Sequence, residues 1–535
     1  MSNGKVEMAN DAETNSVVES SRPVSATDER YAWYVLSVLV LVYVVNFIDR
    51  QILSILANDI KRDLGLTDGD LGFLYGTAFG VFYAIFGIPL GRLADNWSRV
   101  RLMSAGLSLW SVMTALSGFS RSGGELALAR IGVGVGEATA SPCAYSLLSD
   151  LFPRERRATA LAIYSSGLYI GGGLSLFIGG LVVENWNTSF PGRSGPFGLA
   201  GWQAAFLAVG LPGLLLALWV STLSEPIRGL SDGAAKPNSP SPFRDFFNEL
   251  VTIIPPLTIV GAARRGISAL AVNLLVAGLC TLSGWGLVRL TGDVPQWTAI
   301  ATGSYALFSW ATALRYRDPP AFALIVGSPA FLLAVLGYGL IAFSAYGVSL
   351  WAAPYAMREF GAAPSEAGLL VGGAGALGGF LGVIGGGRLA DRLKRTIPSG
   401  RVIVMLVGAI TPIPFLIVSY TTTSLPLFYW LYLPMAILAA CALGASAATT
   451  QDLVLPRMRG VATATFFLGT TFIGLALGPY LAGRVSQATG DLGTGVLSLL
   501  AAAPIAIGAI LVLYRILPRA EASVVARARA AGEPI

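Results

Sequence analysis

Long apolar runs, each about 20 residues in length, follow one another along most of the chain and are separated by short polar segments. A helix rises about 1.5 Å per residue, so about 20 apolar residues cross the roughly 30 Å hydrocarbon core of a bilayer. A transmembrane β-barrel would instead show short segments in which apolar and polar residues alternate. The pattern therefore predicts an all-α polytopic membrane protein.

The apolar runs form two sets of six with an inserted pair between them. We place the first six spans at about 33–56, 70–90, 102–118, 125–150, 158–184 and 202–222. We place the last six at about 330–357, 365–387, 402–420, 426–450, 460–483 and 493–516. Two further runs, at about 267–288 and 297–314, predict an inserted helical hairpin and bring the expected total to about 14 transmembrane helices.

This spacing divides the chain into five parts. They are a disordered cytoplasmic tail (1–30), an N-terminal six-helix bundle (31–223), a linker with an interfacial helix and the inserted transmembrane hairpin (224–319), a C-terminal six-helix bundle (320–518) and a second cytoplasmic tail (519–535). Within the third part, residues 231–242 are rich in Ser, Pro and Gly and predict a linker, whereas 243–254 mix apolar and charged residues as an interfacial helix does.

Composition agrees with a membrane location and narrows the chemistry. Hydrophobic residues make up 54% of the 535-residue chain and charged residues 12%, with a mean hydropathy of +0.66. Histidine is missing, and the three cysteines show no CxxC spacing, so neither a metal site nor a disulfide framework is indicated. No nucleophile with a base and no nucleotide motif points to an enzyme, and we expect no cofactor.

The positive charge follows membrane topology. The net charge of +6 is divided among many short loops, which argues against a nucleic-acid partner. With both termini inside, about 27 of the 36 Lys and Arg fall in cytoplasmic loops and about 7 outside. We therefore expect a multi-pass cell-membrane protein with both termini cytoplasmic, and its alanine- and arginine-rich character favours a bacterial inner membrane. A monomer in contact with membrane lipids is expected.

An internal repeat carries the first family resemblance. The string Gly-Arg-Leu-Ala-Asp occurs at 91–95 and again at 387–391, each time where a glycine-rich apolar run gives way to a basic stretch. A second pair, Pro153-Arg-Glu-Arg156 and Pro456-Arg-Met-Arg459, opens the fifth span of each half. Two such halves resemble the major facilitator superfamily of secondary transporters. The resemblance implies the major facilitator fold, with two pseudo-symmetric six-helix bundles, and transport by alternating access.

The same resemblance implies a contact between the halves on the cytoplasmic side. It assigns Gly91, Asp95 and Arg99 to a conformational latch, and Asp391 and Arg395 to its weaker copy. A carboxylate at a helix end can pair with a loop arginine and face the positive N-terminus of a neighbouring helix. Breaking this latch is expected to favour the inward-open state.

Four ionisable residues lie inside predicted spans of the N-terminal half. Asp49 and Arg50 are in the first span, and Arg130 and Glu137 are in the fourth. A charge at the bilayer centre costs about 2.5 to 3.5 kcal/mol, so each needs a partner. All four lie at depths of about 20 to 30 Å from the cytoplasmic ends, so they can meet. Their charges sum to zero, and the C-terminal half has no comparable set. We expect this quartet to couple protons or bind substrate, and a static salt-bridge cluster is the alternative.

The quartet also sharpens the resemblance. An Asp-Arg pair in the first span, with Arg130-Ile-Gly-Val-Gly-Val-Gly-Glu137-Ala in the fourth, resembles the spinster branch, whose members are associated with export of sphingosine 1-phosphate and lysophospholipids. The likeness covers about 33–222 and 320–516. It departs at Ser98, where the superfamily loop usually has glycine, and at the inserted hairpin, which resembles that of one peptide-transporter branch and is expected to pack peripherally.

These observations lead to one main functional hypothesis and several rivals. The main hypothesis is a proton-linked secondary transporter of amphipathic lysolipid-like or sphingolipid-like anions, in which arginine binds the head group. Candidates for lining a cavity for the lipid tail are Tyr75, Phe79, Tyr338, Tyr346 and Trp351. A proton-coupled drug antiporter and a symporter of sugar acids or other small organic anions keep the same fold. A non-transporting membrane sensor and a membrane enzyme are the hypotheses from other classes.

Overall fold

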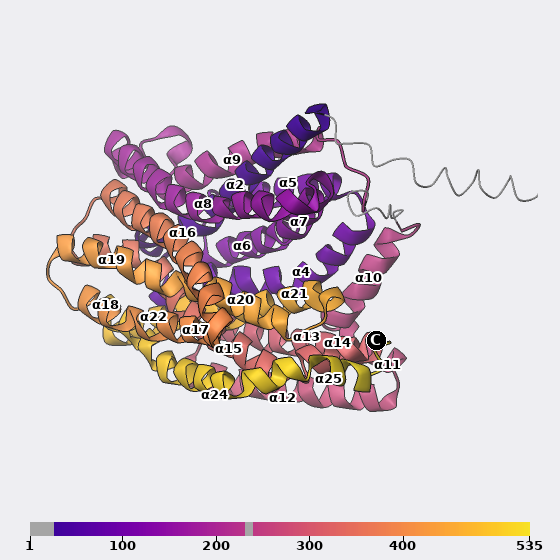
Figure 1. The fold of residues 1–535 in the computed structure, drawn as a ribbon. Helices are drawn as coiled ribbons and strands as arrows, with labels where there is room; N and C mark the ends of the chain where they lie inside the picture. The colour runs from indigo at the N-terminus through magenta and orange to yellow at the C-terminus, as the bar shows by residue number, and fades with distance from the viewer. Residues whose placement is uncertain (1–25, 230–238, 535) are drawn as a thin grey trace, which may run out of the picture.

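The computed structural model describes residues 26–229 and 239–534, and within these ranges the chain forms helices and turns without any strand (Figure 1). Eleven of the described helical segments are long and apolar enough to cross a membrane. The prediction of an all-α multi-pass membrane protein is confirmed. Residues 1–25 of the predicted tail and most of the predicted linker at 231–242 lie outside the described residues, whereas 26–30 already belong to the first helix.

The N-terminal half runs from α2 to α9. Its elements are α2 (Ala26–Leu64), α3 (Asp68–Gly72), the π-helical turn η1 (Phe73–Thr77), α4 (Ala78–Asn96), α5 (Arg99–Ser117), α6 (Gly123–Glu137), α7 (Ala140–Leu151), α8 (Arg154–Ser189) and α9 (Gly201–Ser221). The elements α3, η1 and α4 are continuous and form the second predicted span. The fourth predicted span is interrupted directly after Glu137, so it consists of α6 and α7.

The C-terminal half repeats this plan from α15 onward. Its helices are α15 (Pro329–Glu359), α16 (Pro364–Thr396), α17 (Gly400–Ile410), α18 (Pro412–Ser419), α19 (Leu425–Ala440), α20 (Ala442–Asp452), α21 (Arg459–Thr470), the π-helical η6 (Thr471–Leu475), α22 (Gly478–Thr489), α23 (Leu492–Leu497), the 3₁₀ turn η7 (Ser498–Ala502), α24 (Ala503–Ala522) and α25 (Val524–Ala530). The segment expected to be a tail is therefore helical, and Arg457 pairs with Glu533 near the end of the chain.

Five helices lie between the two halves in the described part of the insert and directly after it. They are α10 (Pro242–Ile253), α11 (Leu257–Arg264), α12 (Ile267–Thr291), α13 (Val294–Arg317) and α14 (Pro319–Ile325). The predicted interfacial helix is α10, which meets α11 at a bend of 96°. Helices α5, α6 with α7, and α13 occupy three predicted spans but lie outside the eleven most apolar segments, so the total of 14 spans stays a prediction.

The two halves meet along helices that glycine allows to approach closely. On α8 and α16, a Cβ added to Gly173 would lie 2.8 Å from the carbonyl oxygen of Gly372, a distance that real Cβ atoms do not adopt. In Figure 1 the magenta α8 and the orange α16 lie side by side across this boundary. Small residues at such crossings allow helix backbones to pack together in a membrane.

Polar contacts between the halves gather toward the end where α2 ends and α3 begins. Asp68, almost fully buried, accepts hydrogen bonds from Lys61 Nζ (2.7 Å), Arg358 Nη1 (2.9 Å) and Ser486 Oγ (2.7 Å). Nearer the middle, Ser54 Oγ donates to the carbonyl oxygen of Leu350 at 2.6 Å. We call this end the outer end, because the basic loops lie at the opposite end.

Candidate functional site

The glycines of the fourth-span motif determine where its charged residues lie. A Cβ on Gly134 would lie 2.6 Å from the Phe79 carbonyl oxygen, and one on Gly136 would lie 2.8 Å from the Trp110 backbone nitrogen. Helix α6 can therefore pack directly against α4 and α5. This close packing holds Arg130 and Glu137 in the interior of the half, where both are almost fully buried.

Arg50 and Glu137 form a buried ion pair. Arg50 Nη2 lies 2.7 Å and Nε 3.1 Å from Glu137 Oε2, so both donors share one carboxylate oxygen. The guanidinium also lies over the rings of Phe47 and Phe79, each 4.6 Å from the ring centroid, and of Tyr83 at 5.1 Å. Cation–π contacts of this kind add stability when the cation is removed from water.

Arg130 does not pair with a carboxylate of the described residues, although the zero net charge of the quartet suggested that it would. Its Nη1 and Nη2 donate to the backbone carbonyl oxygens of Asp49 (3.1 Å) and Arg50 (3.4 Å) rather than to a carboxylate. Helix α2 is thereby tied to α6 at the residues that carry the charges. Glu137 pairs with Arg50 of the other helix rather than with Arg130 of its own.

Asp49 is fully buried, and neither of its carboxyl oxygens has a hydrogen-bond partner among the described residues. The Thr114 hydroxyl and the Trp110 indole of α5 are polar neighbours of its carboxyl group. These two groups, and the hydroxyl of Ser111, also lack a hydrogen-bond partner within the described chain. The structure thus separates the quartet into a paired Arg50 and Glu137 and an unpaired acid beside neutral donors.

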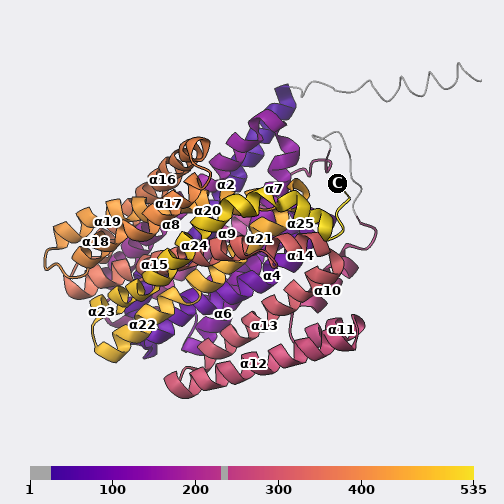
Figure 2. The same cartoon turned by 60° about the horizontal axis from the view of Figure 1, so that its bottom comes forward.

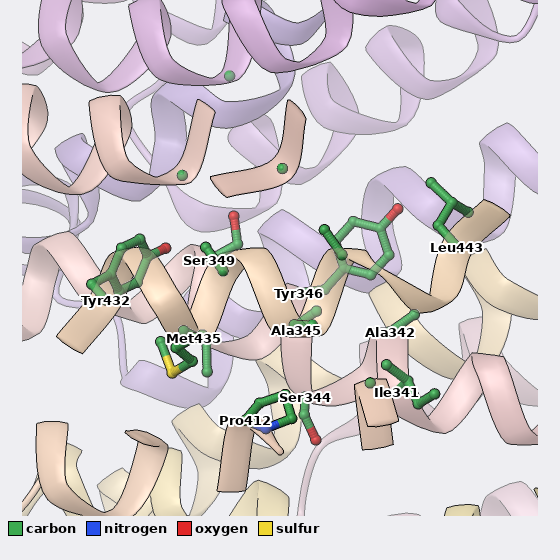
Figure 3. Close-up of a pocket in the computed structure, with 18 of the residues that line it drawn as sticks. Ile341, Ala342, Ser344, Ala345, Tyr346, Ser349, Pro412, Tyr432, Met435 and Leu443 are labelled. Atoms are coloured by element: carbon green, nitrogen blue, oxygen red, sulfur yellow. The ribbon is translucent and has the colours of Figure 1, made fainter. Parts of the chain in front are cut away.

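A cavity of about 300 Å³ lies next to the quartet, between the two halves and reaching into the C-terminal half (Figure 3). Its wall is apolar apart from tyrosine and serine hydroxyls and the amide of Gln51, and no charged residue lines it in the described part of the chain. Gln51 and Phe47, which flank Arg50, are the lining residues from α2. The cavity and the Arg50–Glu137 pair are therefore neighbours separated by one layer of side chains.

The predicted aromatic residues divide into two groups. Tyr338 and Tyr346 line the cavity, and Figure 3 shows Tyr346 on the same helix as Ser349. Tyr75, Phe79 and Trp351 do not line the cavity. The Tyr75 hydroxyl donates to Gln51 Oε1 at 2.5 Å, Phe79 packs on both arginines of the quartet, and Trp351 Nε1 donates to the Pro479 carbonyl oxygen at 3.0 Å, toward the outer end.

Several cavity residues were not predicted from the sequence. They are Phe47, Gln51, Tyr169, Tyr432, Met435 and Leu443, together with small residues of α16. Gly372, Gly375 and Gly379 line the cavity, because the missing side chains leave space beside α8.

The predicted latch residues do not join the two halves in this conformation. Arg99 is fully buried, pairs with Asp150 and Glu225 of its own half, and donates to the Ser146 hydroxyl at 2.9 Å. Asp95 contributes its backbone carbonyl oxygen to Arg228 at 2.5 Å, and a Cβ on Gly91 would meet only a Pro142 carbon, 4.0 Å away. In this conformation Arg99 instead holds the ends of α5, α7 and α9 together within the N-terminal half, and the latch between the halves stays a prediction.

Glu225 completes this cluster after the end of α9. Burial raises the pKa of its carboxyl, but hydrogen bonds from the Ser98 hydroxyl and from the backbone and side chain of Arg99 outweigh it and hold the pKa below its usual value. Ser98, the position that departs from the superfamily loop, caps α5 by accepting a hydrogen bond from the Arg101 backbone N–H. The Ser98 hydroxyl thus stabilises the start of α5 and holds Glu225, which a glycine at this position could not do.

The second copy of the cluster uses residues that the sequence comparison missed. Asp391 accepts from Arg401 at 3.1 Å rather than pairing with Arg395, which is exposed. Arg401, at the start of α17, pairs with Asp452, as Arg99 at the start of α5 pairs with Asp150. A sequence signal for these pairs exists, because Asp150 and Asp452 occupy matching positions shortly before the two Pro-Arg-x-Arg strings.

Comparisons with known proteins agree with this architecture. The sequence profile of the Major Facilitator Superfamily matches residues 39–356 and 334–535. An MFS-type efflux pump of Mycolicibacterium smegmatis is 28% identical over 90% of this chain and 92% of its own length. Protein spinster homolog 1 of Xenopus laevis is 26% identical over 85% of this chain and 74% of its own length.

Solved structures give the same result in three dimensions. A bacterial homolog of the human lysosomal transporter spinster, in an inward-facing and occupied conformation, matches with a TM-score of 0.62 and 26% identity over 93% of this chain and 97% of that chain. A peptide transporter of 15% identity matches the fold with a TM-score of 0.61 over 91% of this chain and 95% of that chain. The chain belongs to the Major Facilitator Superfamily and resembles the spinster transporters within it.

Proposed function

We propose that this protein is a proton-linked secondary transporter of single-tailed amphipathic anions of the lysolipid or sphingolipid type. The observation that supports it best is the apolar cavity of about 300 Å³ beside the buried Arg50–Glu137 pair. A tail needs an apolar space, and an anionic head group needs a cation that water does not screen. In the structure, one layer of side chains separates the apolar cavity from the Arg50 guanidinium.

Arg50 is the proposed head-group residue. Its guanidinium is close to the cavity through Phe47 and Gln51, and it is held by a single oxygen of Glu137. Arginine binds phosphate through two parallel hydrogen bonds, so a phosphate can replace a carboxylate that uses only one oxygen. Exchange of Glu137 for substrate would free the acid to take up a proton.

Asp49 is the proposed second proton carrier. It lies next to Arg50 in the chain, is fully buried, and has no hydrogen-bond partner within the described residues. Burying an ionised carboxylate without a partner costs free energy. Whether Asp49 is ionised therefore depends on whether the surrounding helices bury it or expose it to water. A change in the α2–α6 contact made by Arg130 would alter that exposure during the transport cycle.

A drug antiporter is the second candidate, and two observations favour it. The described cavity wall has no charged residue, which suits neutral or weakly charged apolar compounds. The Mycolicibacterium relative that matches most of this chain is named an efflux pump. Sugar-acid transport has less support, because the galactarate/D-glucarate transporter of Bacillus subtilis matches only 36% of this chain and the cavity is apolar.

Uptake into proteoliposomes tests the proposal. Labelled lysophosphatidylglycerol, sphingosine 1-phosphate and a neutral lipophilic dye are supplied with and without an imposed pH gradient. The variants are wild type, Glu137→Gln, Asp49→Asn and, as a matched control, Glu155→Gln, which changes an exposed acid at the start of α8. We expect gradient-dependent uptake of the two lipids by wild type and Glu155→Gln, and loss of gradient dependence in the other two variants.

Other results would contradict the proposal. Uptake of the dye without uptake of either lipid would favour the drug antiporter. Lipid uptake that ignores both the gradient and the two buried substitutions would make the quartet a structural ion-pair cluster. Each variant is compared only after gel filtration shows a single folded species.

A further inference from the structure

The inserted hairpin lies along one of the two boundaries between the halves. We call the boundary between α3–η1–α4 and η6–α22 the covered seam, and the boundary between α8 and α16 the exposed seam. Figure 2 shows α13 alongside the bundle and α12 farther out. A Cβ on Gly303 of α13 would lie 3.0 Å from Val81 of α4 and 2.5 Å from the Phe472 ring of η6, so α13 contacts both halves at one point.

A single carbonyl group joins the hairpin to both halves. The Ala476 carbonyl oxygen, directly after the π-helical turn η6, accepts from Thr77 Oγ1 of the N-terminal half at 2.6 Å and from Gln296 Nε2 of α13 at 3.5 Å. All three residues are buried. Three parts of the chain therefore meet in the interior of the covered seam.

Further contacts attach the hairpin at each of its ends. At the outer end, Arg484 Nε lies 3.1 Å from Asp293 Oδ2, and its Nη2 donates to the Thr291 carbonyl oxygen at 2.5 Å. The Tyr480 hydroxyl donates to the same aspartate. At the opposite end, Arg317 pairs with Glu249 of α10 at 2.5 Å, and α10 packs on α4. The hairpin is thus attached to the covered seam at its outer end and in the interior, and through α10 to α4 at the opposite end.

The cavity lies against the other seam. Its wall includes residues from both α8 and α16, among them Leu168, Tyr169 and Gly379, but none from α4, η6, α22 or the described insert. The ring of Tyr169 rests on Gly379, where a Cβ would lie 2.2 Å from it. Apolar side chains on both sides of this seam are exposed, including Ile170 and Phe380. Lipid can therefore contact this seam, and the ring of Tyr169 forms part of the cavity wall there.

We infer that amphipathic molecules pass between the bilayer and the cavity through the exposed seam alone, because the inserted hairpin covers the other side. The inference rests on the proposed function for its biological meaning, but the route is a property of the protein and can be measured without transport. The hairpin thereby restricts access from the bilayer to the cavity to one side of the protein.

Cysteine labelling from within the bilayer tests the route. The background replaces Cys143, Cys280 and Cys441 by alanine, and single cysteines are placed by Leu168→Cys in the exposed seam or Val81→Cys beneath α13. The probe is a two-chain phosphatidylglycerol with a maleimide at the end of one acyl chain, in phosphatidylethanolamine vesicles. We expect the cysteine at 168 to react at least about tenfold faster than the cysteine at 81.

Displacing the hairpin provides the decisive comparison. Gly303→Phe places a ring where α13 touches Val81 and Phe472, so it should move α13 away and raise the reactivity of the cysteine at 81 severalfold. Gly286→Phe on α12 is the matched control, because a Cβ there would meet nothing within 4 Å. It should leave the reactivity of the cysteine at 81 unchanged. Gel filtration and thermal melting show that each variant is folded.

The inference is overturned if the cysteine at 81 reacts as fast as the one at 168 with the hairpin in place, or if the cysteine at 168 stays unreactive toward the lipid probe while a water-soluble maleimide labels it. Failure of lysolipid uptake in the transport assay would overturn the proposed function without changing these labelling rates. The two proposals can therefore fail separately.

Discussion

The two halves share one scaffold but differ in the middle of the membrane. At the end opposite the outer end, both have an arginine at the start of the third span, Arg99 or Arg401, paired with an aspartate at the end of the fourth, Asp150 or Asp452. In the interior, the N-terminal half contains the buried charged quartet, whereas the C-terminal half contributes most of an apolar cavity wall.

This difference shows which parts of a duplicated fold can diverge. An ion pair between helix ends stabilises each half separately, so both copies keep it. The interior lies between the halves, where one charged side and one apolar side together suit the amphipathic substrate that we propose. Four predictions, in order of decreasing effect, test this division of roles.

Removing the charge from the N-terminal interior should have the largest effect. Arg50→Ala leaves Glu137 buried without its partner, which should cost about 3 to 5 kcal/mol of unfolding free energy. It also removes the proposed head-group cation, so lipid uptake should fall about 100-fold, which corresponds to about 2.8 kcal/mol of binding free energy. Arg50→Lys keeps the charge but loses the planar guanidinium, so it should recover only part of the activity. Uptake by Arg50→Ala near the wild-type rate, in folded protein, would contradict the assignment of the head-group site.

The two copies of the cytoplasmic ion pair should differ in stability. The Arg99 side chain is fully buried, whereas 18% of the Arg401 side chain is exposed. Arg99→Ala should therefore cost about 3 to 5 kcal/mol and Arg401→Ala about 1 kcal/mol of unfolding free energy. Thermal unfolding in detergent measures both. Equal losses of unfolding free energy in the two variants would show that the difference in burial does not determine how much each ion pair stabilises the protein.

Filling the apolar wall should have a smaller effect than removing the charge. Ala439→Trp puts an indole into a cavity of about 300 Å³ and should lower lipid uptake about tenfold, or about 1.4 kcal/mol. Leu381→Trp, at a position on α16 that is 52% exposed, is the matched control and should leave uptake within about twofold of wild type. A similar loss in both variants would point to general destabilisation rather than to occupancy of the cavity.

The smallest effect concerns pH and the Glu225 cluster. The pKa of Glu225 is lower in the folded protein than in an unfolded chain, where it is about 4.3. The ionised carboxylate therefore contributes stability above about pH 4.3, and this contribution is lost as the pH falls through the lowered folded value. Glu225→Gln should lower the Tm by a few degrees at pH 7, and the gap from wild type should narrow below pH 4. A gap that is constant with pH would contradict this linkage.

Much of the fold could be predicted because it follows from local pattern. Apolar runs of bilayer length locate the helices, and the repeated Gly-Arg-Leu-Ala-Asp string shows that the chain is duplicated. The charges of the quartet stand out because an apolar segment rarely contains them. Its pairing could not be predicted, since Arg130 uses backbone carbonyl groups that every residue has and that no sequence pattern marks.

The sequence by itself determined that this is a duplicated helical membrane protein with buried charges in one half, because hydrophobic length and charge are properties of each residue. Only the tertiary structure decided that Arg50 pairs with Glu137, that Asp49 has no partner among the described residues, and that α13 covers one of the two seams. Those features depend on the angles and distances between helices that are far apart in the chain. Close packing at glycines such as Gly303 sets these distances, and a glycine looks the same in the sequence whether or not another helix lies against it.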